Sequence, residues 1–116
     1  MKRDWNLIRT VLQEVEGLSA KDRNGFAYTV TGDDTEKAEH ALLLKQAGFI
    51  NAIDVGSFGG KTIMSPELTW QGHELLNAIR SEPVWERIKK LAKEKGLEMT
   101  LDVVKGLAKI ALDQML

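Results

Sequence analysis

A glycine-rich run ending in Lys and Thr is the segment of this sequence closest to a catalytic motif. It reads Gly56-Ser57-Phe58-Gly59-Gly60-Lys61-Thr62. A phosphate-binding Walker A loop needs four residues between its glycines, and this run has three between Gly56 and Gly60. Such a loop also opens a helix whose amide groups face the phosphate, whereas residues 61–64 are typical of a strand. The sequence therefore predicts a glycine-tipped turn and no bound cofactor.

The two histidines each stand beside a glutamate, as Glu39-His40 and His73-Glu74. Neighbouring residues on a helix do not share a face, and His73 lacks the second histidine of a zinc-binding helix. The chain contains no cysteine to supply a thiolate ligand. We therefore predict no metal site, and we expect each histidine to make a hydrogen bond near a packed helix seam.

The serines do not lie in a recognisable nucleophile motif. No Gly-x-Ser-x-Gly elbow occurs, and Ser19, Ser57, Ser65 and Ser81 stand in turn or capping contexts. Two histidines also give few ways to build a catalytic triad. The sequence predicts no catalytic residue, so we expect a protein that is not an enzyme.

The elements that position these residues follow from the spacing of apolar side chains. Helical spacing over residues 4–16 predicts a first helix, which a polar loop over 19–25 separates from a short strand at 26–31. A second helix is expected over 35–47. Asp33 and Glu36 have the offset of a capping box at its start, and Gly48 with Phe49 suits a Schellman-type end.

The second half of the sequence predicts a β-hairpin followed by three helices. The hairpin strands are expected at 49–55 and 61–64, and Thr69 is placed to cap a helix over 70–80. Pro83 suits the first turn of a further helix that ends at Gly96, and Thr100 precedes the last one. At 116 residues, the chain can bury one core. We predict a single domain over 1–116, with a core over 1–80 and a helical pair over 81–116.

This order predicts an α+β, mostly helical fold. A helix, a short strand, a helix, a β-hairpin and a further helix resemble a winged helix-turn-helix core, to which two C-terminal helices are added. The resemblance rests on Ala47-Gly48-Phe49-Ile50 and on Leu68-Thr69-Trp70-Gln71-Gly72. No apolar periodicity predicts the usual middle helix between Gly17 and Asp33.

Several short motifs resemble the bacterial and phage family known as domain of unknown function 2513. They are Leu7-Ile8-Arg9, the Ala47-Gly48 pair, Leu68-Thr69-Trp70-Gln71-Gly72-His73-Glu74 and Ala78-Ile79-Arg80. The resemblance extends over nearly the whole chain and implies a winged-helix-like core in small proteins often carried by prophages. It implies no activity and no set of site residues.

Charge bears directly on nucleic-acid binding. Sixteen Lys and Arg stand against seventeen Asp and Glu, so the chain has a net charge of -1 and no cationic surplus for phosphates. The alternative function, a DNA-binding transcriptional regulator, would use the 35–47 helix and the 56–61 wing. Its candidate DNA- or partner-binding residues are Lys37, His40, Lys45, Gln46 and Lys61.

The last predicted helix offers a different surface, because apolar residues occupy much of its circumference. Such a helix needs cover on more than one side, either from the core or from another chain. We therefore expect a small non-enzymatic protein that binds a protein partner, or a second copy of itself, through the C-terminal helix. No apolar run is long enough for a membrane span, and the absence of cysteine fits a cytoplasmic location.

Overall fold

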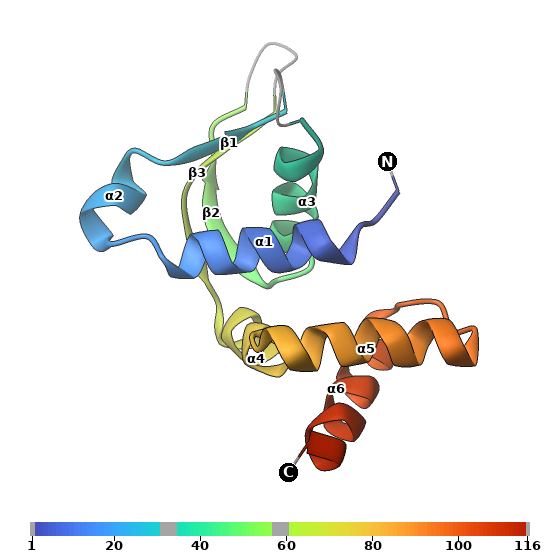
Figure 1. The fold of residues 1–116 in the computed structure, drawn as a ribbon. Helices are drawn as coiled ribbons and strands as arrows, with labels where there is room; N and C mark the ends of the chain where they lie inside the picture. The colour runs from blue at the N-terminus through green and yellow to red at the C-terminus, as the bar shows by residue number, and fades with distance from the viewer. Residues whose placement is uncertain (1, 31–34, 57–60, 116) are drawn as a thin grey trace. The chain divides into compact units, whose positions relative to one another are not determined.

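The structure is a computed structural model that describes residues 2–30, 35–56 and 61–115. These residues contain six helices and three strands (Figure 1). In chain order they are α1 (Trp5–Glu16), α2 (Ala20–Asn24), β1 (Ala27–Thr29), α3 (Thr35–Gln46), β2 (Ile50–Asp54), β3 (Thr62–Leu68), α4 (Trp70–Ile79), α5 (Glu82–Lys95) and α6 (Leu101–Met115). The predicted α+β, mostly helical class is confirmed.

The chain divides into two compact units, Met1–His73 and Glu74–Leu116. The division falls within α4, whereas the sequence suggested a boundary between residues 80 and 81. Each unit has buried apolar residues of its own. Whether the units act as one domain stays a prediction.

A three-stranded antiparallel sheet with strand order β1-β3-β2 forms the centre of the first unit. Helix α1 packs on α3 and on β3, while α3 contacts β1 and β2 and α2 contacts β3. The buried side chains come from every third or fourth position of α1 and from the inward residues of α3 and the sheet, namely Trp5, Ile8, Val11, Leu12, Val15, Tyr28, Ala38, Ala41, Leu44, Ile50 and Ile63.

Helix α3 ends in a Schellman motif. Gly48 has a φ of 86°, in the left-handed region that favours glycine. The Phe49 N–H donates to the Leu44 carbonyl at 2.9 Å, and the Gly48 N–H donates to the Lys45 carbonyl at 3.1 Å. The predicted end of this helix is thereby confirmed, and the chain turns directly into β2.

Thr69 and Gly72 join the end of the hairpin to the end of α3. The Thr69 hydroxyl donates to the Gly48 carbonyl at 2.6 Å and accepts from the Gly72 N–H at 3.1 Å. The Thr69 N–H donates to the Phe49 carbonyl at 3.1 Å. A Cβ atom at Gly72 would overlap the Phe49 carbonyl oxygen. Thr69 is therefore the helix cap that the sequence predicted, and Gly72 permits a backbone contact that a larger residue would block.

Helix α2 was not predicted, because residues 19–25 were expected to form a polar loop. It has five residues and no buried side chain, so no apolar periodicity predicts it. Its local signal is Ser19, whose hydroxyl accepts from the Asp22 N–H at 3.1 Å. Since α2 precedes β1, it does not lie between β1 and α3, and the winged-helix arrangement stays a prediction.

Strand β3 runs to Leu68, beyond the predicted 61–64, and contains a bulge. Asn51 pairs with Glu67 and Ile53 pairs with Met64, so Ser65 and Pro66 lie opposite Ala52 alone. A proline in this central strand is tolerated there because the bulge removes the need for a ladder N–H. The Asp33 and Gly59–Gly60 positions of the predicted cap and wing lie outside the described residues.

The second unit consists of the end of α4 with α5 and α6, of which the last two pack together. Ser81 caps α5, and Gly96 ends it with a φ of 64°; the Thr100 hydroxyl accepts from the Val103 N–H at 3.2 Å at the start of α6. The end of α5 at Gly96 and the start of α6 after Thr100 agree with the predicted positions. The buried residues are Leu75, Leu76, Ile79, Val84, Trp85, Ile88, Leu91, Ala92, Val104, Leu107, Ala108 and Ala111.

Two glycine substitutions test the contact at Gly72. We expect Gly72→Ala to lower the free energy of unfolding by about 3 kcal/mol or more, because the added methyl group forces Phe49 away. The matched control is Gly106→Ala in α6, where an added Cβ has nothing within 4 Å. The control should raise stability by about 1 kcal/mol through helix propensity alone. Urea denaturation measures both, and equal effects would contradict the proposed contact.

Candidate functional site

The predicted binding residues of α3 lie in unlike environments. Lys37 and Lys45 are half-buried, His40 is buried, and Gln46 is exposed. Lys61 is exposed just before β3. The structure therefore does not bring these five residues together as one exposed face of a helix.

His40 is a core residue with 1% of its surface exposed. The Asp4 N–H donates to Nε2 at 2.8 Å, so we assign the ring proton to Nδ1, which lies 2.6 Å from the Glu36 carbonyl and donates to it. Both ring nitrogens are thus engaged. The histidine links the start of α1 to α3, as expected of a histidine near a packed helix seam, while its candidate role in contacting DNA or a partner stays a prediction.

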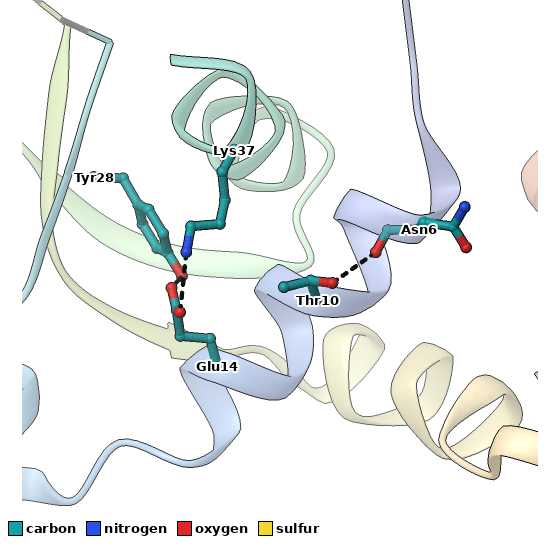
Figure 2. Close-up of polar contacts among 5 residues, drawn as sticks. All are labelled: Asn6, Thr10, Glu14, Tyr28 and Lys37. Carbon is teal, nitrogen blue, oxygen red and sulfur yellow. Dashed lines mark hydrogen bonds and ion pairs between the residues drawn. The ribbon is translucent and has the colours of Figure 1, made fainter. Parts of the chain in front are cut away.

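Lys37 belongs to a polar cluster between α3, α1 and β1 (Figure 2). Its Nζ atom lies 3.2 Å from Oε2 of Glu14, and the Tyr28 hydroxyl donates to Oε1 of the same carboxylate at 2.6 Å. Burial, together with this hydrogen bond and the negative charge of Glu14, raises the pKa of Tyr28 well above its ordinary value of 10.0. Lys37 therefore has an internal partner.

The sequence did not predict this cluster, because its members lie on three separate elements. A weak signal exists in Glu14, which lies between the buried Val11 and Val15 on α1. Figure 2 shows Glu14 directed toward both Tyr28 and Lys37, while Asn6 and Thr10 make a separate contact along α1.

Other cations of the first unit also have close partners. The Arg3 guanidinium lies 5.5 Å from the centre of the Trp5 ring, and Arg23 pairs with Glu67 at 3.2 Å. With Lys37 paired to Glu14, the charged residues left on α3 are Glu36, Glu39 and Lys45, two acids against one base. The net charge of these three residues is negative, and a negative charge repels the phosphates of DNA.

The remaining motifs form no group of metal-ligating side chains in the described ranges. No three His, Cys, Asp or Glu side chains there come close enough to hold a metal ion, and His73 is exposed on α4. Thr62 begins strand β3 rather than a helix, as the strand interpretation predicted. Residues 57–60 of the glycine-rich run lie outside the described residues.

An open pocket of about 380 Å³ lies where α2 meets β2 and the bulge of β3. Its lining includes Arg23, Asn24, Asn51, Ile53, Ser65 and Glu67. Ser65 has a φ of 54°, an uncommon conformation for a residue other than glycine. The pocket was not predicted from the sequence, because neither the bulge nor α2 has an apolar periodicity that would indicate it.

Apolar side chains are exposed on both flanks of the last helix. The buried stripe of α6 comprises Val104, Leu107, Ala108 and Ala111. Ile110 lies to one side of this stripe and is 42% exposed, while Leu112 lies to the other and is 44% exposed. Met115, in the last turn, is 50% exposed. Within the part of the chain that the structure describes, no helix has the length and apolar character of a bilayer span.

Taken together, these elements define a small α+β protein. The chain belongs to the family described as "Hypothetical protein (DUF2513)", which matches residues 2–98. The chain is similar to an "Uncharacterized protein" of Haemophilus influenzae, with 41% identity over 117 residues that cover 100% of this chain and 99% of the relative. No solved structure matches it.

The single tyrosine of the chain offers a direct test of the polar cluster. Because its folded-state pKa is raised, the neutral hydroxyl contributes stability below about pH 10, and this contribution is lost as the pH rises further. We expect no tyrosinate absorbance from the folded chain near pH 10.5, whereas the urea-unfolded chain should titrate near 10. Tyr28→Phe should lower the unfolding free energy at pH 7 by about 1 to 2 kcal/mol. Half-ionisation of the folded chain near pH 10 would contradict this assignment.

Proposed function

We propose that this chain is a non-enzymatic module that binds another protein, or a second copy of itself, through α6. The observation that carries the proposal is the set of exposed apolar side chains on this helix: Ile110 on one side of the buried stripe, Leu112 on the other, and Met115 at the end of the stripe itself. Exposed apolar side chains that extend a buried stripe are typical of a surface that another chain covers.

The charged residues of α6 indicate which part of this helix stays in contact with water. Asp102, Lys109 and Asp113 lie on the side of the helix away from the buried stripe, between Ile110 and Leu112. These charged side chains keep that face in water, so a partner would cover the apolar side chains that border the stripe. A partner that covers these flanks would bury area that the unit leaves exposed.

The DNA-binding alternative has less support from the same side chains. It needs several cations facing phosphates, and of its five candidate residues one is buried and one is paired with Glu14. Lys45, Gln46 and Lys61 remain, a set with two positive charges. We therefore prefer protein binding.

A double substitution on the flanks of α6 tests the proposal. We expect Ile110→Ser with Leu112→Ser to reduce binding at least tenfold, a loss of about 1.4 kcal/mol, because the apolar contact area is removed. The binding is measured by sedimentation for a second copy and by quantitative capture on the immobilised chain for a partner from the native host. The matched control is Lys109→Ser with Asp113→Ser on the charged face, which should bind as the unchanged chain does.

The proposal fails if the unchanged chain is monomeric and captures no protein, or if the flank variant binds as well as the control. Circular dichroism and thermal denaturation must first show that both variants retain the helical fold, since the substituted side chains are partly exposed.

A gel-shift experiment separates the two functions. At roughly 50 mM salt, where phosphate contacts are strong, we expect no retardation of random genomic fragments by the chain. Lys45→Ala with Lys61→Ala should leave this result unchanged. Salt-sensitive retardation that the double variant loses would instead support the regulator alternative.

A further inference from the structure

The pocket at the bulge of β3 has the size and the backbone geometry of a small-molecule site. Its volume of about 380 Å³ falls within the range of roughly 300 to 1,000 Å³ that is usual for such sites. Its lining includes Ser65 and Ala52, which lie opposite each other at the bulge. Bulges are frequent beside binding and active sites, and uncommon backbone conformations such as that of Ser65 are kept mainly at functional positions.

One cation and one anion lie side by side in this pocket. Nη1 of Arg23 is 3.2 Å from Oε2 of Glu67, and the two side chains are 33% and 53% exposed. An ion pair this exposed adds little stability, so both groups stay accessible to a ligand. Within the described ranges, the pair uses one of the five guanidinium N–H groups and one of the two carboxylate oxygens. The remaining N–H groups can bind an anionic group, and the second oxygen can bind a cationic group.

Three uncharged polar side chains share the pocket with this ion pair. Asn24, Asn51 and Ser65 line it, and their side chains have no hydrogen-bond partner within the described ranges. Amide and hydroxyl groups can both donate and accept hydrogen bonds. They can therefore add hydrogen bonds to either charged end of a small ligand.

An apolar side chain borders these polar groups. Ile53 lines the pocket and is 60% exposed. An alkyl group of a ligand that covers Ile53 would remove apolar surface of both molecules from water, which favours binding. The lining thus combines two opposite charges, neutral polar groups and one exposed apolar side chain.

We propose that this pocket binds a free α-amino acid with an aliphatic side chain. The carboxylate of the ligand pairs with the guanidinium of Arg23, its ammonium group pairs with the second carboxylate oxygen of Glu67, and its side chain covers Ile53. A zwitterion complements two opposite charges that lie 3.2 Å apart, whereas a ligand with a single charge would also meet a charge of its own sign. The pocket lies in the first unit and α6 in the second, so this inference does not depend on the function proposed above.

The experiment uses the full isotope-labelled chain and three probes, which are leucine, leucinamide and N-acetyl-leucine. Leucinamide lacks the carboxylate and N-acetyl-leucine lacks the ammonium group, while both keep the side chain. Dissociation constants are measured from the shifts of amide resonances during titration. We expect about 1 mM for leucine, as suits a ligand of this size, and at least tenfold weaker binding of each analogue. The largest shifts should occur at residues 23, 24, 51–53 and 65.

Two variants assign the charged groups of the pocket separately. Arg23→Gln should abolish the preference for leucine over leucinamide, because the partner of the carboxylate is lost. Glu67→Gln should abolish the preference for leucine over N-acetyl-leucine, because the partner of the ammonium group is lost. The matched control is Lys21→Gln, an exposed position on α2 outside the pocket lining, which should keep both preferences.

The inference is overturned if leucine at about 10 mM shifts no resonance of the pocket, or if either analogue binds as tightly as leucine. It is also overturned if the Arg23 and Glu67 variants keep both preferences, or if the shifts are confined to residues outside the pocket. If a variant does not fold, the three probes on the unchanged chain decide the question. The α6 flank variant should bind leucine normally, so failure at α6 and failure at this pocket can be distinguished.

Discussion

The close approach of Gly72 to the Phe49 carbonyl is the contact on which the first unit depends. It lies where α3 ends, β2 begins, β3 ends and α4 begins. Three hydrogen bonds surround it, all involving Thr69, which reaches the Gly48 carbonyl, the Phe49 carbonyl and the Gly72 N–H. A side chain at position 72 would separate the hairpin from the end of α3. The Leu-Thr-x-x-Gly pattern is thus a packing requirement as well as a helix start.

The same unit uses its polar side chains for internal contacts. His40 joins α3 to the backbone at Asp4, and Lys37 joins α3 to Glu14 and, through that carboxylate, to Tyr28. These contacts fix α1 against the side of α3 that carries both residues. A helix held in this way presents its other side to solvent, and the charged residues left there are two glutamates and one lysine. This side of α3 therefore has no cationic surplus for phosphates.

Sequence patterns predicted the long elements because their signals are local. Apolar spacing identified α1, α3, α5 and α6, and Gly48, Thr69, Gly96 and Thr100 marked ends and caps that the structure confirms. Helix α2 and the bulge at Ser65 were missed, since the helix has no buried residue and the bulge depends on pairing across strands. The pocket between them was missed for the same reason. The partners of Lys37 and His40 could not be predicted, because they depend on how α1 packs, which the spacing within α3 does not reveal.

We propose that this chain contacts protein through α6 and does not contact DNA through α3. Photo-crosslinking in the native host tests it most directly, with a photoreactive amino acid placed at position 112 or, as the comparison, at position 45. We predict protein adducts from position 112 and no nuclease-sensitive adduct from position 45. A nuclease-sensitive adduct from position 45, with no protein adduct from position 112, would contradict the claim.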